Sequence, residues 1–320
     1  MFKIGDFEGE LFIGKGAFGK VYKTYSLSKG RNVAIKKIKD EDRFRYAALK
    51  EIKILNYINS LRKSDIKIPI VNFYGEFMEG NIQYLVFELL DIDLYTYYKN
   101  CSHELNLDNI VKIMIQICEG LSYIHTKYIH GDLKPENIMI DKLTKKIKII
   151  DLGSSFEKNK IKKNFYVQSR YYRAPELIYE LQHNEKIDIW SVGCIMFELI
   201  ALKPLFKGKN SIDLIYKISE FISLPKEKEY LNSTKFNYLY CQIIDTEKFT
   251  YLHNKEKYKE PDFRLREFLY IYLDCFKVET LFKENIYDFF KEVFVYDFNL
   301  RISAKDCILQ LKTIKNAVLL

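Results

Sequence analysis

The sequence predicts an α+β protein in two parts, a small β-rich lobe over residues 1–88 and a larger, mainly α-helical lobe over residues 92–320. Short β-branched and aromatic runs separated by turns dominate the first part. Beyond a joint at residues 89–91, apolar residues recur at helical spacing. The hydrophobic content of 48% and aromatic content of 15% are ample for a packed core and exclude a largely disordered chain.

The small lobe is expected to begin with two strands that flank a glycine-rich turn. These strands should cover Leu11–Ile13 and Lys20–Tyr25, and a further β-rich run covers Asn32–Ile38. A helix is expected over Arg43–Leu61, where apolar residues have helical spacing, and a last strand over Ile82–Phe87.

The large lobe is expected to be built from helices. The periodic segments are Asn106–Thr126, Ile187–Ala201, Asp213–Phe221 and Tyr287–Val295. The most apolar run, Ile189–Phe206, contains Glu198 and Pro204, is too short to span a membrane, and is interpreted as a buried core helix. Residues 230–263 are polar, aromatic and weakly periodic, and their structure is left unassigned.

Composition narrows the classes of partner. The net charge of +8 is compatible with nucleic-acid binding, but Lys and Arg are spread along the whole chain, which favours a solvated surface and no direct nucleic-acid contact. The six cysteines occur singly, without the spacing of a metal site or a disulfide framework, so a reducing compartment is expected. No secretory signal is evident at the start, and we expect a soluble protein without membrane contact.

The most informative feature is a pair of motifs, H-G-D-L-K-P-E-N and I-D-L-G-S-S, which place two carboxylates, a lysine and an asparagine at fixed offsets. Asp132 would accept the proton of an attacking hydroxyl, and Lys134 would lie along the transferring phosphate. Asn137 and Asp151 would hold Mg²⁺ between the phosphates of a nucleotide. The alternative is a plain polar turn between two apolar stretches. It is disfavoured because the complete pair of motifs would very rarely occur by chance.

These motifs resemble the catalytic loop and the metal-binding segment of the eukaryotic protein kinases. The resemblance implies the bilobal protein-kinase fold, as one kinase domain over residues 1–320 with its hinge at residues 89–91. It also implies ATP as the phosphate donor, Mg²⁺ as the cofactor and proteins as the substrates.

The glycine-rich turn is a candidate phosphate-binding element. Ile13 and Val21 flank the pattern G-x-G-x-F-G-x-V, whose glycines are Gly14, Gly16 and Gly19. Without side chains there, a β-turn can lie close over phosphates and offer its backbone N–H groups. Dinucleotide-binding folds also use G-x-G-x-x-G, but here a strand follows instead of a helix, and V-A-I-K comes downstream as in kinases.

The resemblance implies partners for the phosphates and for adenine. Lys36, the last residue of V-A-I-K, would bind the phosphates and pair with Glu51, although Glu51 could instead be a solvated surface charge and Glu41 lies nearby in sequence. The stretch Y-L-V-F-E-L-L resembles the strand and hinge that bind the base. The resemblance implies that backbone groups of Glu88 and Leu90 pair with adenine and that Asp93 binds the ribose hydroxyls. Phe87 would be the gatekeeper residue behind the base, although it could equally be an ordinary core residue.

The string N-F-Y-V-Q-S-R-Y-Y-R-A-P-E resembles the dual-specificity tyrosine-regulated kinases and the homeodomain-interacting kinases, within the CMGC group. The likeness covers nearly the whole chain. It implies that the kinase phosphorylates its own Tyr166, and that Arg170 and Arg173 receive the phosphate. Two guanidinium groups can bind a phosphate with nearly two negative charges bidentately.

Three departures from common kinase patterns refine the assignment. Gly131 stands where most regulated kinases have an arginine that clamps a phosphothreonine, so threonine control of the activation segment is not expected. Leu152 replaces a phenylalanine, with apolar packing as its role. Asn164 replaces a second tyrosine, which favours the homeodomain-interacting branch or a divergent relative. The chain begins almost at the glycine loop, so we expect it to lack the upstream segment that assists tyrosine maturation in part of the family.

Two architectural contacts are also implied. Glu176 should form a buried ion pair with Arg301, and Asp188 should anchor the backbone of the catalytic loop.

We therefore expect an active serine/threonine kinase, because Lys134 within D-L-K-P-E-N favours Ser and Thr acceptors over those of dedicated tyrosine kinases. We expect it to be monomeric and to reside in the nucleus, the cytoplasm or both. One alternative is a kinase of a neighbouring CMGC branch, splicing-related or cyclin-dependent, against which Y-V-Q-S-R-Y-Y-R argues. The other is a scaffold without activity, which is disfavoured because every catalytic position is filled.

Overall fold

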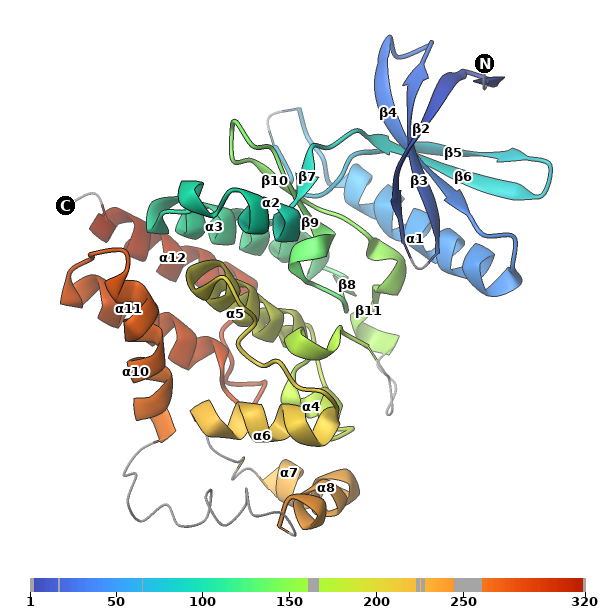
Figure 1. The fold of residues 1–320 in the computed structure, drawn as a ribbon. Helices are drawn as coiled ribbons and strands as arrows, with labels where there is room; N and C mark the ends of the chain where they lie inside the picture. The colour runs from blue at the N-terminus through green and yellow to red at the C-terminus, as the bar shows by residue number, and fades with distance from the viewer. Residues whose placement is uncertain are drawn as a thin grey trace.

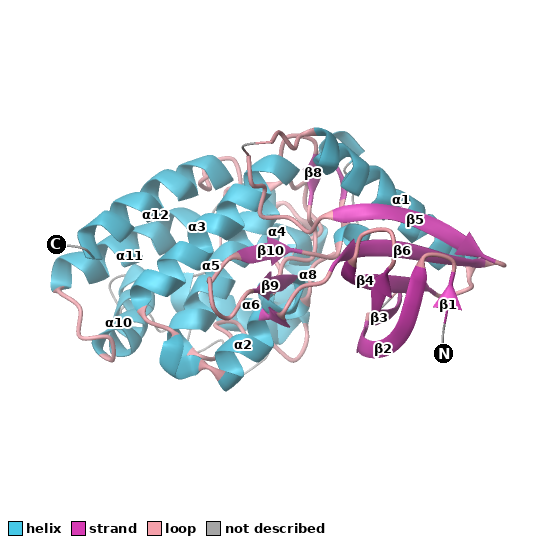
Figure 2. Cartoon of the chain, turned by 90° about the horizontal axis from the view of Figure 1, so that it is seen from above, coloured by secondary structure: helices cyan, strands magenta, loops and turns pink. Residues whose placement is uncertain are grey.

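The computed structural model describes residues 3–16, 18–64, 66–160, 167–222, 225, 228–244 and 261–318. It confirms the predicted α+β architecture, with a β-rich lobe that contains the N-terminus and a larger helical lobe that contains the C-terminus (Figure 1). Seen from above, the long strands gather at one end of the molecule and most helices at the other (Figure 2).

A six-stranded antiparallel sheet in the order β1-β2-β3-β4-β6-β5 forms the small lobe. The bounds are β1 Lys3–Ile4, β2 Phe7–Lys15, β3 Gly19–Ser26, β4 Arg31–Ile38, β5 Phe73–Glu79 and β6 Ile82–Glu88. Four of these strands lie where the sequence predicts them, and β2 is several residues longer than expected. β5 was not anticipated, because most of its residues are partly or fully exposed and its apolar residues do not alternate clearly.

Helix α1, Asp42–Ser60, is the helix predicted at Arg43–Leu61. It buries one face that includes Ile54, Leu55 and Ile58, at the spacing of a helix packed on one side. It contacts β4 in the sheet and also the turn Leu152–Ser154 of the large lobe. The helix therefore connects the sheet to the segment that carries Asp151.

The large lobe contains helices and short strands. The helices are α2 Leu94–Asn100, α3 Leu107–Ile124, α4 Pro175–Ile178, α5 Lys186–Ala201, α6 Ser211–Ile222, α7 Lys228–Leu231, α8 Thr234–Ile244, α10 Pro261–Asp274, α11 Thr280–Val293 and α12 Ala304–Val318. The strands are β7 Ile92–Asp93, β8 Tyr128–Ile129, β9 Ile138–Ile140, β10 Ile147–Ile149 and β11 Phe156–Glu157. The helices predicted at α3, α5, α6 and α11 are present. Within the unassigned residues 230–263, α8 and the start of α10 are helical, and residues 245–260 lie outside the described part of the chain.

Helix α5 is the centre of the large lobe. Every residue from Ile187 to Ile200 is buried, as expected for a helix that is apolar all round. At Gly193 an added Cβ would lie 2.5 Å from Val293 Cγ1, so a glycine is needed for the close contact between α5 and α11. The interpretation as a buried core helix is confirmed for Ile189–Ala201, whereas the rest of the predicted run lies beyond the helix, which ends at Leu202 in the left-handed conformation. Within the described ranges no helix has the length and apolar character to cross a membrane.

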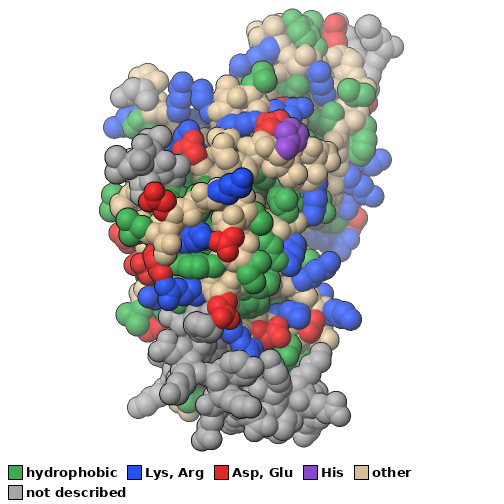
Figure 3. All heavy atoms as spheres, turned by 60° about the vertical axis from the view of Figure 1, so that its left-hand side comes forward, with side chains coloured by type: hydrophobic (Ala, Val, Ile, Leu, Met, Phe, Trp, Pro, Cys, Tyr) green, Lys and Arg blue, Asp and Glu red, His purple; other side chains and the backbone are tan. Residues whose placement is uncertain are grey.

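The basic side chains are dispersed on the face drawn in Figure 3. Lys and Arg lie there among acidic and apolar side chains rather than in one patch. Elsewhere some pair with carboxylates, such as Lys53 with Glu157 at 2.8 Å and Lys158 with Glu185 at 2.7 Å. The Lys and Arg side chains visible on this face thus form no single basic patch.

The predicted ion pair between Glu176 and Arg301 is confirmed. Both side chains are fully buried, and Arg301 Nη1 and Nη2 donate to the two oxygens of Glu176 at 2.8 and 3.0 Å. The guanidinium also donates to the carbonyls of Val295 and Lys186. Because each charge is paired and hydrogen-bonded, removing only one partner would leave the other charge buried without compensation.

We predict that Arg301→Met destabilises the protein by about 3–5 kcal/mol, since Glu176 would keep an uncompensated buried charge. Urea unfolding of the wild type and the variant measures this difference. Lys291→Met is the matched control, because Lys291 pairs with Asp288 on the surface and its loss should cost at most about 1 kcal/mol. Equal effects of the two changes would contradict the architectural role of Arg301.

Candidate active site

A cleft of about 630 Å³ lies between the two lobes. Its walls come from the glycine-rich hairpin β2–β3, from β4 and α1, from the connection after β6 and from the catalytic loop. The predicted site residues that line it are Ile13, Gly14, Gly16, Val21, Lys36, Glu51, Glu88, Leu90, Asp93, Asp132, Lys134, Asn137 and Asp151. The fold therefore brings residues from both lobes to one cavity.

Lys36 lies in β4 and points towards two carboxylates. Its Nζ donates to Glu51 Oε2 at 2.8 Å and to Asp151 Oδ1 at 3.3 Å. The Glu51 side chain is buried on α1, whereas Glu41 pairs with Arg43 at the surface. Burial by itself lowers the pKa of Lys36, but Glu51 and Asp151 outweigh burial and hold its pKa above the usual value. Lys36 is therefore charged and fixed in position.

The carboxylate of Asp188, on α5, holds the backbone of the catalytic loop in place. Asp188 accepts hydrogen bonds from the backbone N–H groups of His130 at 2.8 Å and Gly131 at 3.0 Å, and its Oδ2 lies 2.9 Å from His125 Nε2. Burial by itself raises the pKa of Asp188, but the hydrogen bond and charge of His125 and the other donors outweigh it and lower the pKa. The predicted anchor is confirmed.

Asp132 is fixed at both of its carboxylate oxygens. Oδ1 accepts from the backbone N–H and the hydroxyl of Ser169, at 2.9 and 2.8 Å, and Oδ2 accepts from Lys134 Nζ at 2.9 Å. Lys134 Nζ also donates to Ser169 Oγ at 3.0 Å. Ser169 was not predicted as a site residue, because its contact with Asp132 joins segments far apart in the sequence.

Asn137 and Asp151 present oxygen atoms that suit a hard cation. Asn137 Nδ2 donates to the backbone carbonyl of Asp132 at 2.8 Å, which orients the amide and leaves its oxygen for another partner. Asp151 has the left-handed backbone conformation, with φ of 59°. No group of three or more His, Cys, Asp or Glu in the described segments could hold a metal alone. The donor set fits Mg²⁺, which is usually held by one or two protein oxygens together with phosphates and water.

The segment that follows β6 is placed where a base could bind. Glu88 donates its backbone N–H to the Asn72 carbonyl at 3.0 Å and accepts at its side chain from Asn72 N–H, so its N–H is not available to a base. Phe87 lines the cleft and also packs on Phe73, so both of its expected roles are compatible with the structure.

Asp93 has a structural function that the sequence analysis missed. It is the N-cap of α2 and accepts from Thr96 N–H at 2.8 Å and from Thr96 Oγ1 at 2.7 Å. Asp93 also lines the cleft. Both carboxylate oxygens are thus already engaged, and the expected ribose contact stays a prediction.

Gly19 differs from the other two glycines of the turn, because it is not among the lining residues of the cleft. A Cβ at Gly19 would lie 2.1 Å from the carbonyl oxygen of Lys37, whereas at Gly14 or Gly16 it would meet no atom within 4 Å. Gly19 thus has a separate reason to be glycine, because β3 and β4 approach closely there, and its expected contact with the phosphates stays a prediction.

The activation segment is described in part. Tyr166 and Asn164 lie outside the described residues. Arg170 is exposed and donates from Nη1 to the Lys209 carbonyl at 2.6 Å. Arg173 is buried, and its Nε and Nη2 donate to the carbonyl of Gln168, which has a left-handed φ of 66°. Arg173 therefore stabilises a strained turn beside Ser169.

Leu152 is fully buried, which confirms its expected role in apolar packing.

The fold and this geometry define the class of protein. Residues 7–311 match the family described as Protein kinase domain. The chain belongs to this family, in agreement with the first resemblance.

Comparison with individual relatives narrows the group of protein kinases that the chain resembles. A probable serine/threonine-protein kinase dyrk2 of Dictyostelium discoideum is 38% identical over 233 residues, which is 72% of this chain and 25% of that protein. The dual specificity tyrosine-phosphorylation-regulated kinase 3 of Rattus norvegicus and that of Homo sapiens are each 37% identical over 243 residues, 72% of this chain and 41% of each relative. The chain is thus similar to the dual-specificity tyrosine-regulated kinases of the CMGC group, as predicted. The matched part spans less than half of these relatives.

We predict that Gly19→Ala destabilises the protein by about 1–3 kcal/mol, because its methyl group would overlap the Lys37 carbonyl. Gly16→Ala, with open space around the added methyl group, should change the stability by no more than about 0.5 kcal/mol. Urea unfolding of both variants without nucleotide measures the contrast. A Gly19→Ala protein as stable as the wild type would contradict the close approach of the strands.

Proposed function

We propose that this chain is a serine/threonine protein kinase that transfers the γ-phosphate of ATP to protein hydroxyl groups and uses Mg²⁺ as its cofactor. The observation that carries the proposal is the convergence of Lys36, Asp132, Lys134, Asn137 and Asp151 on one cleft. Phosphoryl transfer depends mainly on positioning and on compensation of oxygen charge, and these side chains provide both.

Asp132 is the proton acceptor. The acceptor hydroxyl loses its proton to the Asp132 carboxylate while its oxygen forms a bond to the γ-phosphorus, and the bond from that phosphorus to the ADP oxygen breaks. The hydrogen bonds from Ser169 and Lys134 hold the carboxylate in place. Lys134 also places a positive charge beside the transferring group, where it offsets the oxygen charge.

Lys36 binds the nucleotide phosphates on the opposite wall of the cleft. Its contacts with Glu51 and Asp151 fix the ammonium, so little conformational freedom is lost when ATP binds. Asn137 and Asp151 would hold the magnesium ion, which compensates the charge of the β- and γ-phosphates.

The rest of the cleft suits the base and the ribose. We place adenine against residues 89–91, with the Glu88 carbonyl and the Leu90 N–H as its partners and Ile13 and Val21 covering it. Residues 1–88 and 92–320 would then be the two lobes on either side of this hinge.

We also propose that the kinase phosphorylates its own Tyr166. The name of the rat and human relatives, dual specificity tyrosine-phosphorylation-regulated kinase 3, supports regulation through tyrosine. Gly131 carries no side chain that could hold a phosphothreonine. Of the two expected receivers, Arg170 is exposed and Arg173 also donates to the carbonyl of Gln168, and both would contact the phosphate.

The remaining expectations are proposals as well. We propose a monomer that acts on proteins in the nucleus, the cytoplasm or both, without direct binding to nucleic acid. The dispersed Lys and Arg side chains on the face in Figure 3 favour a protein that does not bind nucleic acid directly.

We predict that Asp132→Asn lowers turnover by about 10²–10⁴-fold and leaves nucleotide binding intact, because the change removes a proton acceptor but little volume. Transfer of radiolabelled phosphate from ATP to a generic basic protein measures turnover, and the thermal shift caused by ATP measures binding. Near-normal turnover in this variant would refute the role of Asp132. Inactivity of the wild-type protein would instead favour a scaffold.

We predict that protein made in bacteria carries phosphate on Tyr166, and that Asp132→Asn protein made in the same way does not. Tyr166→Phe should lower the activity at least about tenfold, since a charge-assisted hydrogen bond contributes about 1.5–3 kcal/mol. Mass spectrometry of the purified proteins and the transfer assay check both parts. A fully active wild type with unmodified Tyr166 would exclude this regulation but leave the kinase assignment intact.

A further inference from the structure

The residue that ends the core helix α5 is a leucine in a strained conformation. Leu202 is the C-cap of α5 and has a left-handed backbone, with φ of 56° and ψ of 22°. Glycine is the residue most often found in this conformation at the end of a helix, because a Cβ is disfavoured there. Within the described part of the chain, Leu202 is the only apolar residue other than glycine with a left-handed φ. Its conformation therefore has a cost in free energy that glycine would avoid.

Burial of the Leu202 side chain offsets this cost only in part. The side chain is 40% exposed, whereas the residues of α5 from Ile187 to Ile200 are buried. Single exposed leucines are common on protein surfaces, but here the exposed side chain coincides with backbone strain. Strain of this kind clusters at sites that bind another molecule.

Two lysines lie beside Leu202 and give this surface a positive charge. Lys99, near the end of α2, donates from Nζ to the Leu202 carbonyl at 3.3 Å, and its Nζ lies 5.0 Å from the centre of the Tyr98 ring. Lys203 follows Leu202, and its Nζ lies 5.0 Å from the centre of the Tyr272 ring on α10. Both lysines are exposed, and no carboxylate in the described ranges forms an ion pair with either.

The aromatic rings position these ammonium groups without neutralising them. A cation over a ring is attracted by the negative face of the ring, and its charge remains available to an anion on its other side. The ring of Tyr95 lies 5.7 Å from Lys99 Nζ, and Tyr95 is itself 40% exposed, so it extends the apolar surface of Leu202. We call Tyr95, Lys99, Leu202 and Lys203 the Leu202 surface.

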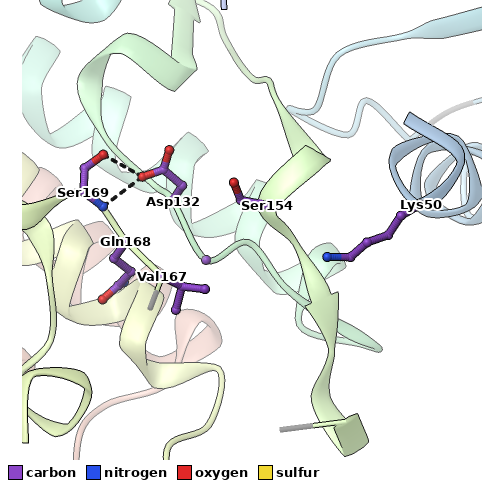
Figure 4. Close-up of a pocket in the computed structure, with 7 residues that line it drawn as sticks. Lys50, Asp132, Ser154, Val167, Gln168 and Ser169 are labelled. Atoms are coloured by element: carbon purple, nitrogen blue, oxygen red, sulfur yellow. Dashed lines mark hydrogen bonds between the residues drawn. The ribbon is translucent and has the colours of Figure 1, made fainter. Parts of the chain in front are cut away.

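The Leu202 surface is connected to the place where a substrate hydroxyl would react. Leu202 follows Glu198 by four residues, which is about one turn of α5. Glu198 accepts a hydrogen bond from the Tyr172 hydroxyl at 2.7 Å, and Tyr172 belongs to the short helical segment that Ser169 caps. Ser169 in turn holds Asp132 by two hydrogen bonds (Figure 4). One protein substrate can therefore contact both Asp132 and the Leu202 surface.

We propose that the Leu202 surface is a docking site for an acidic segment of the protein substrates, separate from the residues around the acceptor hydroxyl. An apolar side chain of the segment packs on Leu202 and Tyr95, and carboxylates on either side of it pair with Lys99 and Lys203. A nucleic-acid backbone would pair with the lysines but would supply no side chain to cover the leucine. The inference rests on the proposed function, because docking favours transfer only to a hydroxyl at Asp132.

The test uses peptides with one constant serine acceptor sequence that the wild type phosphorylates, joined through a Gly-Ser linker to five randomised residues. Linkers of several lengths, on either side of the acceptor, cover the distance between the two sites. Sequencing of the phosphorylated peptides should show enrichment of segments with Leu, Met or Phe between Asp or Glu. An enriched segment should raise kcat/KM about tenfold over a Gly-Ser segment, mainly by lowering KM. Added salt should reduce this gain, because exposed charges are screened.

Substitutions at the Leu202 surface test the contacts. Leu202→Gly and Leu202→Asn should both bring the ratio of the two kcat/KM values close to one. Both replacements tolerate the left-handed conformation, so thermal unfolding of the variants should occur close to the temperature of the wild type. Lys99→Met combined with Lys203→Met should remove the preference for Asp and Glu. Lys291→Met, which removes an exposed charge that pairs with Asp288 on α11, should leave the ratio as in the wild type.

Three results would overturn the proposal. They are the absence of any enrichment of acidic and apolar segments in a wild type that phosphorylates the constant acceptor, an enrichment that persists in both Leu202 variants, and an equal loss in Lys291→Met. Binding of a labelled oligonucleotide that the double lysine variant loses, without a peptide preference, would instead assign the surface to nucleic acid.

A binding experiment separates this inference from the proposed function. The same randomised segments are displayed on phage and selected on immobilised wild type and on Leu202→Gly. Acidic and apolar segments should be enriched on the wild type alone, and identical enrichment on both proteins refutes the docking site. If the wild type transfers no phosphate to any peptide, the proposed function fails, while this selection still decides whether the surface binds such segments.

Discussion

The carboxylate of Asp188 is the contact on which the active site depends. It lies on α5, which is buried on all sides, and it accepts the backbone N–H groups of His130 and Gly131. These two residues immediately precede Asp132, so the position of the Asp132 carboxylate follows from the packing of the core helix. A helix without an exposed face has little freedom to move, and the precision of the site therefore derives from the apolar interior of the large lobe.

The triad of Lys36, Glu51 and Asp151 joins three separate elements: a strand of the sheet, helix α1 and the segment after β10. One ammonium lies between two carboxylates, so the group retains one net negative charge in a partly desolvated cleft. A divalent cation would compensate that charge, and the position of α1 then matters for metal binding as well as for contact with the phosphates.

The chemistry of the site could be predicted from sequence where the contacts are local. Lys134 and Asn137 lie two and five residues after Asp132, so a short motif already determines their spacing. Contacts between distant segments could not be predicted in this way: Ser169 is 37 residues from Asp132, and its role became visible only in the fold. Strand β5 was missed for a related reason, since a mostly exposed strand leaves little alternation in the sequence.

The pair formed by Glu176 and Arg301 has a consequence for biosynthesis. The two residues are 125 positions apart, so a ribosome releases the acidic partner long before the basic one is made. Until the last part of the chain emerges, the nascent large lobe has no counter-ion for a carboxylate that must be buried. The segment around α4 can therefore reach its final packing only after the region that carries Arg301 has been synthesised.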